Sequence, residues 1–455
     1  MSDRPERSAT AILLVLFFGV LMGALDIAIV GPALPALRAH FGVDERAVAW
    51  VFTIYVLFNL LGTPIMAKLS DRLGRRLVYT ADVALFALGS AIAAGAGSFT
   101  QLLVGRAIQA FGAGGIFPVA SAVIGDTLPV ERRGRALGLI GAVFGIAFLV
   151  GPFVAAGLLR FGWAWLFLIN LPIAALLMIA SWRLLPSRRA PEPAPFDWAG
   201  AVLLSGALAA IALGLSAIDS RAIGASLASR AVWPLLLAGA VLLWRLVGVE
   251  RAAADPVLRP SWFAARPVKL VALFAAGAGL GEAAMVFLPD LAVSALGMTP
   301  HDASLMLLPV VLALAIGSPG LGRLLDRVGP RPIILTALVT LALGGVVLAL
   351  LPITRGTLIT AGALVGFGIS GLLGAPLRYV ILDAVAAGER ASAQGILTVF
   401  ISIGQLLCGV LIGAVAASAG GGAEGYREAF GVIAALCAAM AVASLALPPR
   451  RTAVA

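Results

Sequence analysis

The stretch Gly62 to Arg76, GTPIMAKLSDRLGRR, recurs 255 positions later as GSPGLGRLLDRVGPR, Gly317 to Arg331. Seven positions are identical in the two copies, among them Asp71/Asp326, Arg72/Arg327 and Gly74/Gly329. Each copy reads as a tight basic turn between two long apolar runs. A helix–turn–helix unit that occurs twice in an apolar chain predicts a membrane protein built from two related halves, as many transporters are.

The composition of the chain excludes a soluble protein. Of its 455 residues 61% are hydrophobic and only 12% are charged, too few to cover the surface of a soluble domain of this size. The net charge of +10 does not indicate nucleic-acid binding, because the basic residues stand one to five at a time between apolar runs. We therefore expect a lipid bilayer around the protein and no nucleic-acid partner.

Enzymatic activity and cofactors are not expected. No loop has the length of a catalytic domain, and neither Lys68 nor Lys269 stands in a nucleotide-binding P-loop. Cys408 and Cys437 lie in apolar segments, so they suggest neither a disulfide framework nor a metal site. Active transport by this chain would have to use an ion gradient.

Fourteen apolar runs are long enough to cross a bilayer, which takes roughly 20 helical residues. We predict spans at 10–36, 48–67, 77–97, 100–125, 136–159, 165–185, 198–218, 231–249, 268–289, 303–321, 332–352, 356–382, 391–417 and 428–447. With the N-terminus inside, the inside loops and tails carry 24 of the 32 basic residues, the outside loops carry 7, and Arg106 lies within a span. Positive charge gathers on cytoplasmic loops, so both termini are predicted to be cytoplasmic.

The repeat offset also predicts the domain organisation. Six spans with short loops would give an offset near 200 residues, so the observed 255 leaves room for two more spans. The Pro-rich stretch at 186–195 marks the end of the first half. We predict an all-α fold with a six-helix bundle at 1–186, a linker with two inserted helices at 187–265, and a second six-helix bundle at 266–455.

Several segments then resemble the major facilitator superfamily, in its fourteen-helix drug:proton antiporter branch. They are LDIAIVGPALPAL (Leu25 to Leu37), AKLSDRLGRR (Ala67 to Arg76), RAIQAFGAGG (Arg106 to Gly115), GAVFGIAFLVGPFVAAG (Gly141 to Gly157) and WAWLFLINLP (Trp163 to Pro172). Departures occur at Gly31–Pro32, Ala67 and Ala155–Ala156. The resemblance implies a multi-pass protein of the bacterial cytoplasmic membrane that exchanges a small molecule for protons.

The repeated turn is interpreted as a gate. Glycine permits a tight turn and the arginines hold it at the anionic cytoplasmic surface. Simple anchoring of the loop is the alternative, but anchoring needs only basic residues, so the repeated aspartate favours the gate. We expect Asp71 to cap the N-terminus of a neighbouring helix in the outward-facing state. The gate residues predicted are Asp71, Arg72, Gly74, Arg76, Asp326, Arg327, Gly329 and Arg331.

Three ionisable residues inside spans are the candidates for proton coupling. Asp26 lies past the middle of the first span and Arg106 lies within the fourth, where a charge is expensive unless it has a partner or a polar cavity. A shift of 256 aligns Asp26 with Glu282 in the ninth span. We expect Asp26 and Arg106 to lie in a wet crevice between the two bundles, with the arginine influencing proton binding by a nearby carboxylate. The alternatives are a simple structural ion pair for Arg106, and for Glu282 a place near the outer mouth or a contact with another helix.

Other residues receive simpler interpretations. Gly141, Gly145, Gly151 and Pro152 in the fifth span match the antiporter motif, or serve only for close packing and a bend. Asp82, Asp290, Asp383 and Arg378 stand near predicted span ends and are expected to be structural.

The function predicted is a monomeric proton-coupled antiporter that exports hydrophobic or cationic small molecules by alternating access. Three alternatives remain: an exporter of one endogenous metabolite or antibiotic, an uptake symporter, which the antiporter motif disfavours, and a non-transporting membrane sensor or scaffold.

Overall fold

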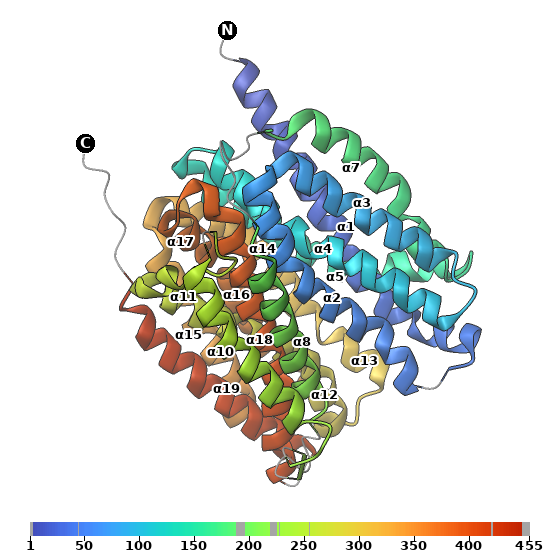
Figure 1. Cartoon of the computed structure of the whole chain (residues 1–455). Helices are drawn as coiled ribbons and strands as arrows, with labels where there is room; N and C mark the ends of the chain where they lie inside the picture. The colour runs from blue at the N-terminus through green and yellow to red at the C-terminus, as the bar shows by residue number, and fades with distance from the viewer. Residues whose placement is uncertain are drawn as a thin grey trace.

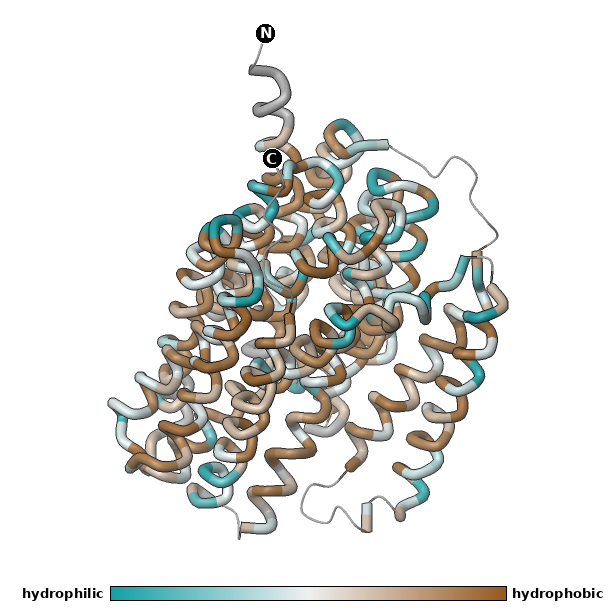
Figure 2. Tube along the Cα trace, turned by 90° about the vertical axis from the view of Figure 1, so that its left-hand side faces the viewer, coloured by the Kyte–Doolittle hydropathy of each residue, from teal (hydrophilic) through white to brown (hydrophobic). Residues whose placement is uncertain are grey.

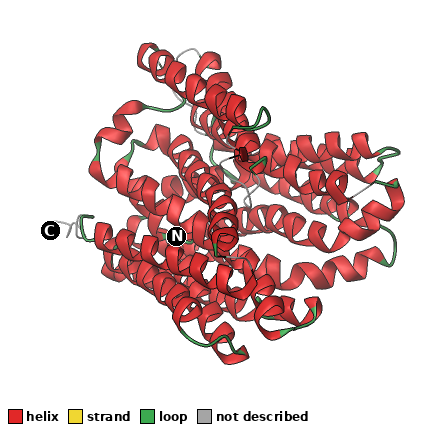
Figure 3. Cartoon of the chain, turned by 90° about the horizontal axis from the view of Figure 1, so that it is seen from below, coloured by secondary structure: helices red, strands yellow, loops and turns green. Residues whose placement is uncertain are grey.

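The described part of the chain is helical except at turns and short connections. The computed structural model describes residues 3–43, 45–187, 196–218, 225–226, 228–253, 255–419 and 422–447, and within these ranges it contains no strand (Figure 3). Among the described residues, fourteen helical segments are long and apolar enough to cross a membrane, as predicted. The Pro-rich boundary of the first bundle falls mostly at 188–195, outside the described residues.

Seven helices make up the first half, with the sixth span split in two. They are α1 (Asp3–Phe41), α2 (Glu45–Leu73), α3 (Arg75–Ala94), α4 (Phe99–Thr127), α5 (Val130–Leu159), α6 (Trp165–Leu168) and α7 (Asn170–Leu184). They pack together on the right of Figure 1 and form what we call the N-bundle.

The second half contains two further broken spans. Its helices are α11 (Arg266–Ala284), α12 (Leu288–Leu296), α13 (Pro300–Leu305), α14 (Leu308–Val328), α15 (Pro330–Leu350), α16 (Arg355–Leu373), α17 (Pro376–Ala384), α18 (Arg390–Ser418) and α19 (Gly422–Ser444), with short 3₁₀ turns at Pro260–Ala264, Met285–Phe287 and Ala387–Glu389. This C-bundle meets the N-bundle along a seam where α5 packs on α14 and α2 packs on α18.

The two inserted helices, α8 (Trp198–Ser216) and α10 (Trp233–Ala252), lie outside both bundles. Figure 1 shows them in front of the molecule, and Figure 2 shows the pair at its right-hand side. The inner one, α8, contacts α2 and α18 and so covers the seam, whereas α10 packs mainly on α8. Most of α10 is exposed and apolar, as expected of a lipid-facing helix.

The repeated motif differs from the predicted loop. Each helix runs beyond the predicted span end, to Leu73 and to Val328, so most of the motif is helical. Only Gly74 and Gly329 interrupt the helices, with φ of 98° and 82°, which glycine adopts without steric cost. The prediction of a loop was wrong because a helix can continue into water once its hydrophobic segment has ended.

Candidate functional site

The first gate residue, Asp71 at the end of α2, caps the N-terminus of α18 across the seam. Its carboxylate accepts hydrogen bonds from the backbone N–H groups of Ala391 at 3.1 Å and Ser392 at 2.7 Å, and from the Ser392 hydroxyl. The first N–H groups of a helix have no partners within it and carry partial positive charge, so a carboxylate is well placed there. The expected helix cap is therefore present.

The second copy of the motif makes the corresponding contact. Asp326, at the end of α14, accepts hydrogen bonds from the backbone N–H groups of Gly134 at 2.8 Å and Arg135 at 2.9 Å. Both donors belong to the first turns of α5 in the N-bundle. The duplication thus gives two caps that cross the seam in opposite directions, at the face that the basic residues assign to the cytoplasm.

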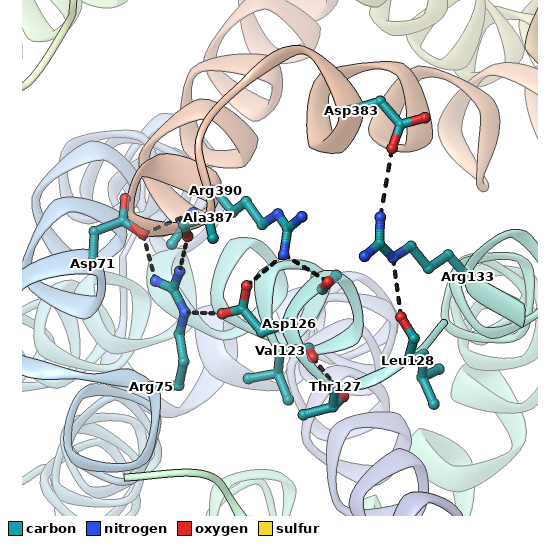
Figure 4. A network of polar contacts seen from close by, with 12 residues as sticks. Asp71, Arg75, Val123, Asp126, Thr127, Leu128, Arg133, Asp383, Ala387 and Arg390 are labelled. Atoms are coloured by element: carbon teal, nitrogen blue, oxygen red, sulfur yellow. Dashed lines mark hydrogen bonds and ion pairs between the residues drawn. The ribbon is translucent and has the colours of Figure 1, made fainter. Parts of the chain in front are cut away.

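A chain of ion pairs extends the first cap across the seam, as Figure 4 shows. Arg75 donates to Asp71 and, through Nε at 3.0 Å, to Asp126 at the end of α4. Asp126 in turn accepts from Arg390 at the start of α18, at 2.8 Å, and Arg75 donates to the Ala387 carbonyl at 3.2 Å. A more exposed pair, Arg133 with Asp383 at 3.5 Å, lies beside it.

The remaining gate residues are placed less centrally. Arg76 donates to the Leu185 carbonyl at 2.7 Å, which ties α3 to the end of α7, and Arg72 lies 6.0 Å from the Phe196 ring. Arg327 is exposed and Arg331 is partly buried. The position that corresponds to Arg75 in the second copy is Pro330, so the ion-pair chain has no sequence equivalent there.

The segment that follows the inserted helices also joins the two bundles at this face. Asp255 pairs with the buried Lys68 of α2 and lies 3.4 Å from Arg259. Arg259 pairs with Glu389 at 2.7 Å, and Trp262 donates its indole N–H to the same carboxylate at 2.9 Å. Since Glu389 directly precedes α18, this linker, residues 255–262, connects α2 to the helix that Asp71 caps.

The glycines of α5 allow the bundles to approach closely. A methyl group at Gly145 would lie 2.8 Å from the Ala315 Cα of α14, and one at Gly141 would lie 2.7 Å from the Gly374 Cα. Gly151 faces α1, where a methyl group would meet Ala28. Gly141 and Gly145 therefore lie where α5 packs closely on the C-bundle, and Gly151 lies where α5 packs on α1 within the N-bundle. The side chain of Pro152 lies outside those that the structure describes.

Asp26 and Arg106 form an ion pair in the interior of the N-bundle. Arg106 Nη1 lies 2.6 Å from Asp26 Oδ2, and neither side chain has any exposed surface. Asp26 Oδ1 also accepts from Gln109 at 2.8 Å and from Asn170 at 3.0 Å. The ring of Tyr55 covers the guanidinium, with its centroid 4.2 Å away.

The prediction that this pair lies in a wet crevice between the two bundles was wrong, because both side chains are enclosed within the N-bundle. The partners of this pair come from the N-bundle, from α2, α4 and the start of α7. The Ser90 hydroxyl of α3 accepts hydrogen bonds from the side-chain amides of both Gln109 and Asn170. The amide and hydroxyl groups supply the hydrogen bonds that water would otherwise provide. The charges are thereby accommodated inside one half.

Glu282, the third predicted coupling residue, lies in a different setting. It is partly exposed near the end of α11 and accepts a hydrogen bond from Gln405 of α18 at 2.9 Å. The helix breaks at Met285–Phe287 immediately afterwards. The two acids that the repeat aligns therefore have unlike partners, and the structure does not bring Glu282 to the Asp26–Arg106 pair.

Two residues expected at span ends are buried instead. Asp82 lies within α3 with no exposed surface, packed against Gly115, and neither carboxylate oxygen has a hydrogen-bond partner among the described residues. Arg378 on α17 is 2% exposed. Neighbouring helices cover both side chains. The length of an apolar run does not predict which of its side chains other helices will cover.

Sequence reasoning missed several residues of the site. Gln109 and Asn170 are uncharged and gave no electrostatic signal, although both lie in motifs that resemble the family. Arg75 stands within the repeated motif, but the second copy has Pro330 at the corresponding position, so the repeat did not indicate a role for Arg75. Asp126 and Arg390 stand at helix ends far apart in sequence. Among the described residues, no group of three or more His, Cys, Asp or Glu side chains could hold a metal ion.

Comparison with known proteins agrees with this architecture. The sequence model of the Major Facilitator Superfamily matches residues 16–249 and 269–455. The chain is 35% identical to the uncharacterized MFS-type transporter YfiU of Bacillus subtilis over 400 residues, 86% of this chain and 77% of YfiU. It is 28% identical to the multidrug transporter protein MdtP of the same organism over 420 residues, 91% of this chain and 77% of MdtP.

The fold is also that of a solved transporter. The human organic anion transporter MFSD10 superposes with a TM-score of 0.69 at 18% identity, over 96% of this chain and 99% of MFSD10. The match of the family model extends over both bundles and the inserted pair, and the seam of α2 with α18 and α5 with α14 joins the two halves. The chain is a multi-pass membrane transporter that belongs to the Major Facilitator Superfamily.

Proposed function

We propose that the protein is a proton-coupled antiporter of the bacterial cytoplasmic membrane that exports hydrophobic or cationic small molecules. The observation that carries the proposal is the enclosed Asp26–Arg106 pair, with 2.6 Å between its charged atoms and no exposed surface on either side chain. Charged groups inside membrane proteins are rare and are associated with proton and substrate pathways. Relatives named as multidrug transporters support the substrate class.

The chemistry of coupling follows from the donors around Asp26. An ionised carboxylate only accepts hydrogen bonds, and Arg106, Gln109 and Asn170 all donate to it. Protonation of Asp26 would remove the negative charge that faces Arg106. The protonated carboxyl oxygen would then donate a hydrogen bond instead of accepting one. The cluster would then have to rearrange, and because its members come from three helices, α1, α4 and α7, the packing of these helices would change with it.

The two aspartate caps supply the second part of the proposal. They hold the bundles together at the cytoplasmic ends, so the substrate path can open to the cytoplasm only when Asp71 and Asp326 leave the N-termini of α18 and α5. We assign proton binding to Asp26, with Glu282 as the acid in the second half, and alternation of access to the caps. The protein acts as a monomer, with the substrate, protons and the bilayer as its partners.

The experiment is substrate efflux measured in inverted membrane vesicles with and without a proton gradient. We expect efflux by the wild type to stop when the gradient collapses and Asp26→Asn to abolish gradient-driven efflux. Asp290→Asn, at an exposed carboxylate on α12, is the matched control and should transport normally. Efflux that persists in Asp26→Asn or without the gradient would refute the proposal.

A further inference from the structure

We propose that Arg378 forms a binding site for an acidic group, a carboxylate or sulfonate, on hydrophobic compounds that enter the transporter from the cytoplasm. The inference rests on the proposed function only in assuming that ligands enter from that side. It identifies one subset of the proposed substrates, the hydrophobic compounds that carry an anionic group, zwitterions included.

Within the part of the chain that the structure describes, the guanidinium of Arg378 is held by neutral groups alone. Its Nη1 donates to Gln394 Oε1 at 3.0 Å, and Nη2 lies 3.5 Å from the Thr398 hydroxyl. Gln394 also donates to the Arg378 carbonyl at 2.9 Å, which orients the pair. The Nε group is buried without a hydrogen-bond partner, and no carboxylate of the described residues forms an ion pair with this arginine.

The acidic residues at this end of the seam are already engaged. Asp71 and Asp126 pair with Arg75, and Asp383 pairs with Arg133. Glu389 pairs with Arg259. Arg378 is thus a cation inside the membrane-spanning region whose charge no described residue compensates, and such a cation is costly enough to mark a functional group.

The position of Arg378 is suited to receive a ligand. The ring of Phe117, on α4 of the N-bundle, covers the guanidinium at 3.8 Å, while Gln394 and Thr398 belong to α18 of the C-bundle. The site therefore straddles the seam. Arg378 lies five residues before Asp383 on the same helix, roughly 7 to 8 Å deeper at the rise of an α-helix.

Opening of the cytoplasmic gate would uncover this site. Once the caps release, α4 moves away from α17 and α18, and the guanidinium loses the Phe117 ring that now covers it. Its Nε and Nη groups could then donate two parallel hydrogen bonds to a carboxylate, a geometry that guanidinium favours. The aromatic ring and the apolar seam beside it would hold the hydrophobic part of the ligand.

The test compares three probes that share one fluorophore, bound to the full-length protein in detergent without any ion gradient. Dansylglycine is anionic, its methyl ester is neutral and dansylcholine is cationic. We expect the wild type to bind dansylglycine at least about 10-fold more tightly than the ester, as for a charge-assisted hydrogen bond. Equal affinity for acid and ester would overturn the inference without any need for a variant.

Variants then assign the preference to Arg378. Arg378→Gln should lower the affinity for dansylglycine about 10-fold or more and leave dansylcholine unchanged, and Arg378→Lys should retain part of the preference. Arg245→Gln is the matched control, since it removes one positive charge from the exposed surface of α10. Unchanged binding of dansylglycine by Arg378→Gln would overturn the inference.

The outcome is separable from that of the proposed function. Efflux that does not depend on the proton gradient would refute the antiport proposal, but it would leave the preference for dansylglycine over its ester unchanged. Gradient-driven efflux together with no preference for the acidic probe would remove only the inference about Arg378.

Discussion

At the scale of single residues, the site shows two ways of holding a charge inside a membrane protein. Asp26 and Arg106 neutralise each other and are completed by the amides of Gln109 and Asn170. Among the described residues, Arg378 has only neutral partners and an aromatic ring. The contrast matters because a compensated pair can be stable in one state, whereas an uncompensated cation attracts an anion whenever the protein opens.

The glycines of α5 offer a test at the same scale, because two of them differ only in what faces them. A methyl group at Gly145 would lie 2.8 Å from the Ala315 Cα across the seam, whereas nothing lies within 4 Å of one at Gly157. We expect Gly145→Ala to destabilise the protein by roughly 1 to 3 kcal/mol, as overpacked contacts do, and Gly157→Ala to have little effect.

Thermal unfolding of the two purified variants, followed by the fluorescence of their tryptophans, measures the difference. Equal unfolding temperatures for Gly145→Ala and the wild type would mean that α5 and α14 are not in close contact in solution.

At the scale of helices, the molecule uses helix termini as contacts between its halves. Asp71 binds the first N–H groups of α18, and Asp326 binds the N–H groups of the fifth and sixth residues of α5, so each half holds one helix of the other. Several spans are also broken: α6 from α7, α11 from α12 and α16 from α17. The first break brings Asn170 to Asp26, and discontinuous helices commonly supply polar groups to transporter sites.

Neutral substitution of the caps should favour the cytoplasm-open state. Asp71→Asn keeps the shape of the side chain but loses the charge that faces Arg75 and the helix N-terminus, and Asp71→Asn/Asp326→Asn weakens both caps. We expect a larger population of widely separated cytoplasmic ends, in the order double variant, single variant, wild type. Glu428→Gln, at an exposed position of α19, is the control.

Electron–electron distance measurements between spin labels at Glu131 and Ala386, exposed residues of the two bundles, report this separation. Identical distance distributions in the wild type and the double variant would show that the caps do not control the gate.

At the scale of the whole molecule, the inserted helices are connected to the face at which the two aspartate caps lie. One of the two inserted helices, α8, covers the seam. The linker that follows α10 joins the two bundles, because its Asp255 pairs with Lys68 of α2 and its Arg259 pairs with Glu389, which directly precedes α18. The insert therefore brings a third connection between the halves at the same face as the two caps.

Weakening this linker should act in the same direction as weakening the caps, but less strongly. Glu389→Gln removes the charge that binds Arg259 while it keeps an acceptor for Trp262. Since Arg259 is 36% exposed and Glu389 20% exposed, the ion pair should contribute no more than about 1 kcal/mol.

The same spin-label pair measures the effect of Glu389→Gln, with Glu424→Gln as control because Glu424 pairs with Arg427 on the exposed surface of α19. A shift as large as that of the double cap variant would mean that the linker, and not the caps, holds the gate.

The sequence by itself determined the class, the number of spans and the cap residues. The length of an apolar run and the side of the membrane on which arginines lie depend on the transfer free energies of individual residues. These energies add along the chain, so they can be estimated from the sequence without knowledge of the fold. The repeat of Asp71 at Asp326 likewise needed no coordinates. The two predicted charges Asp26 and Arg106 were identified for the same reason: each is expensive wherever its helix is placed.

Only the tertiary structure decided which charges meet. Gln109, Asn170 and Ser90 surround Asp26 because four helices pack together, and their contacts depend on rotations and breaks of helices that hydropathy does not encode. The burial of Arg378 and Asp82 was missed for this reason, and so was the chain from Asp71 through Arg75 and Asp126 to Arg390. Pairing energies fall off over a few ångströms, so they exist only once the seam has formed.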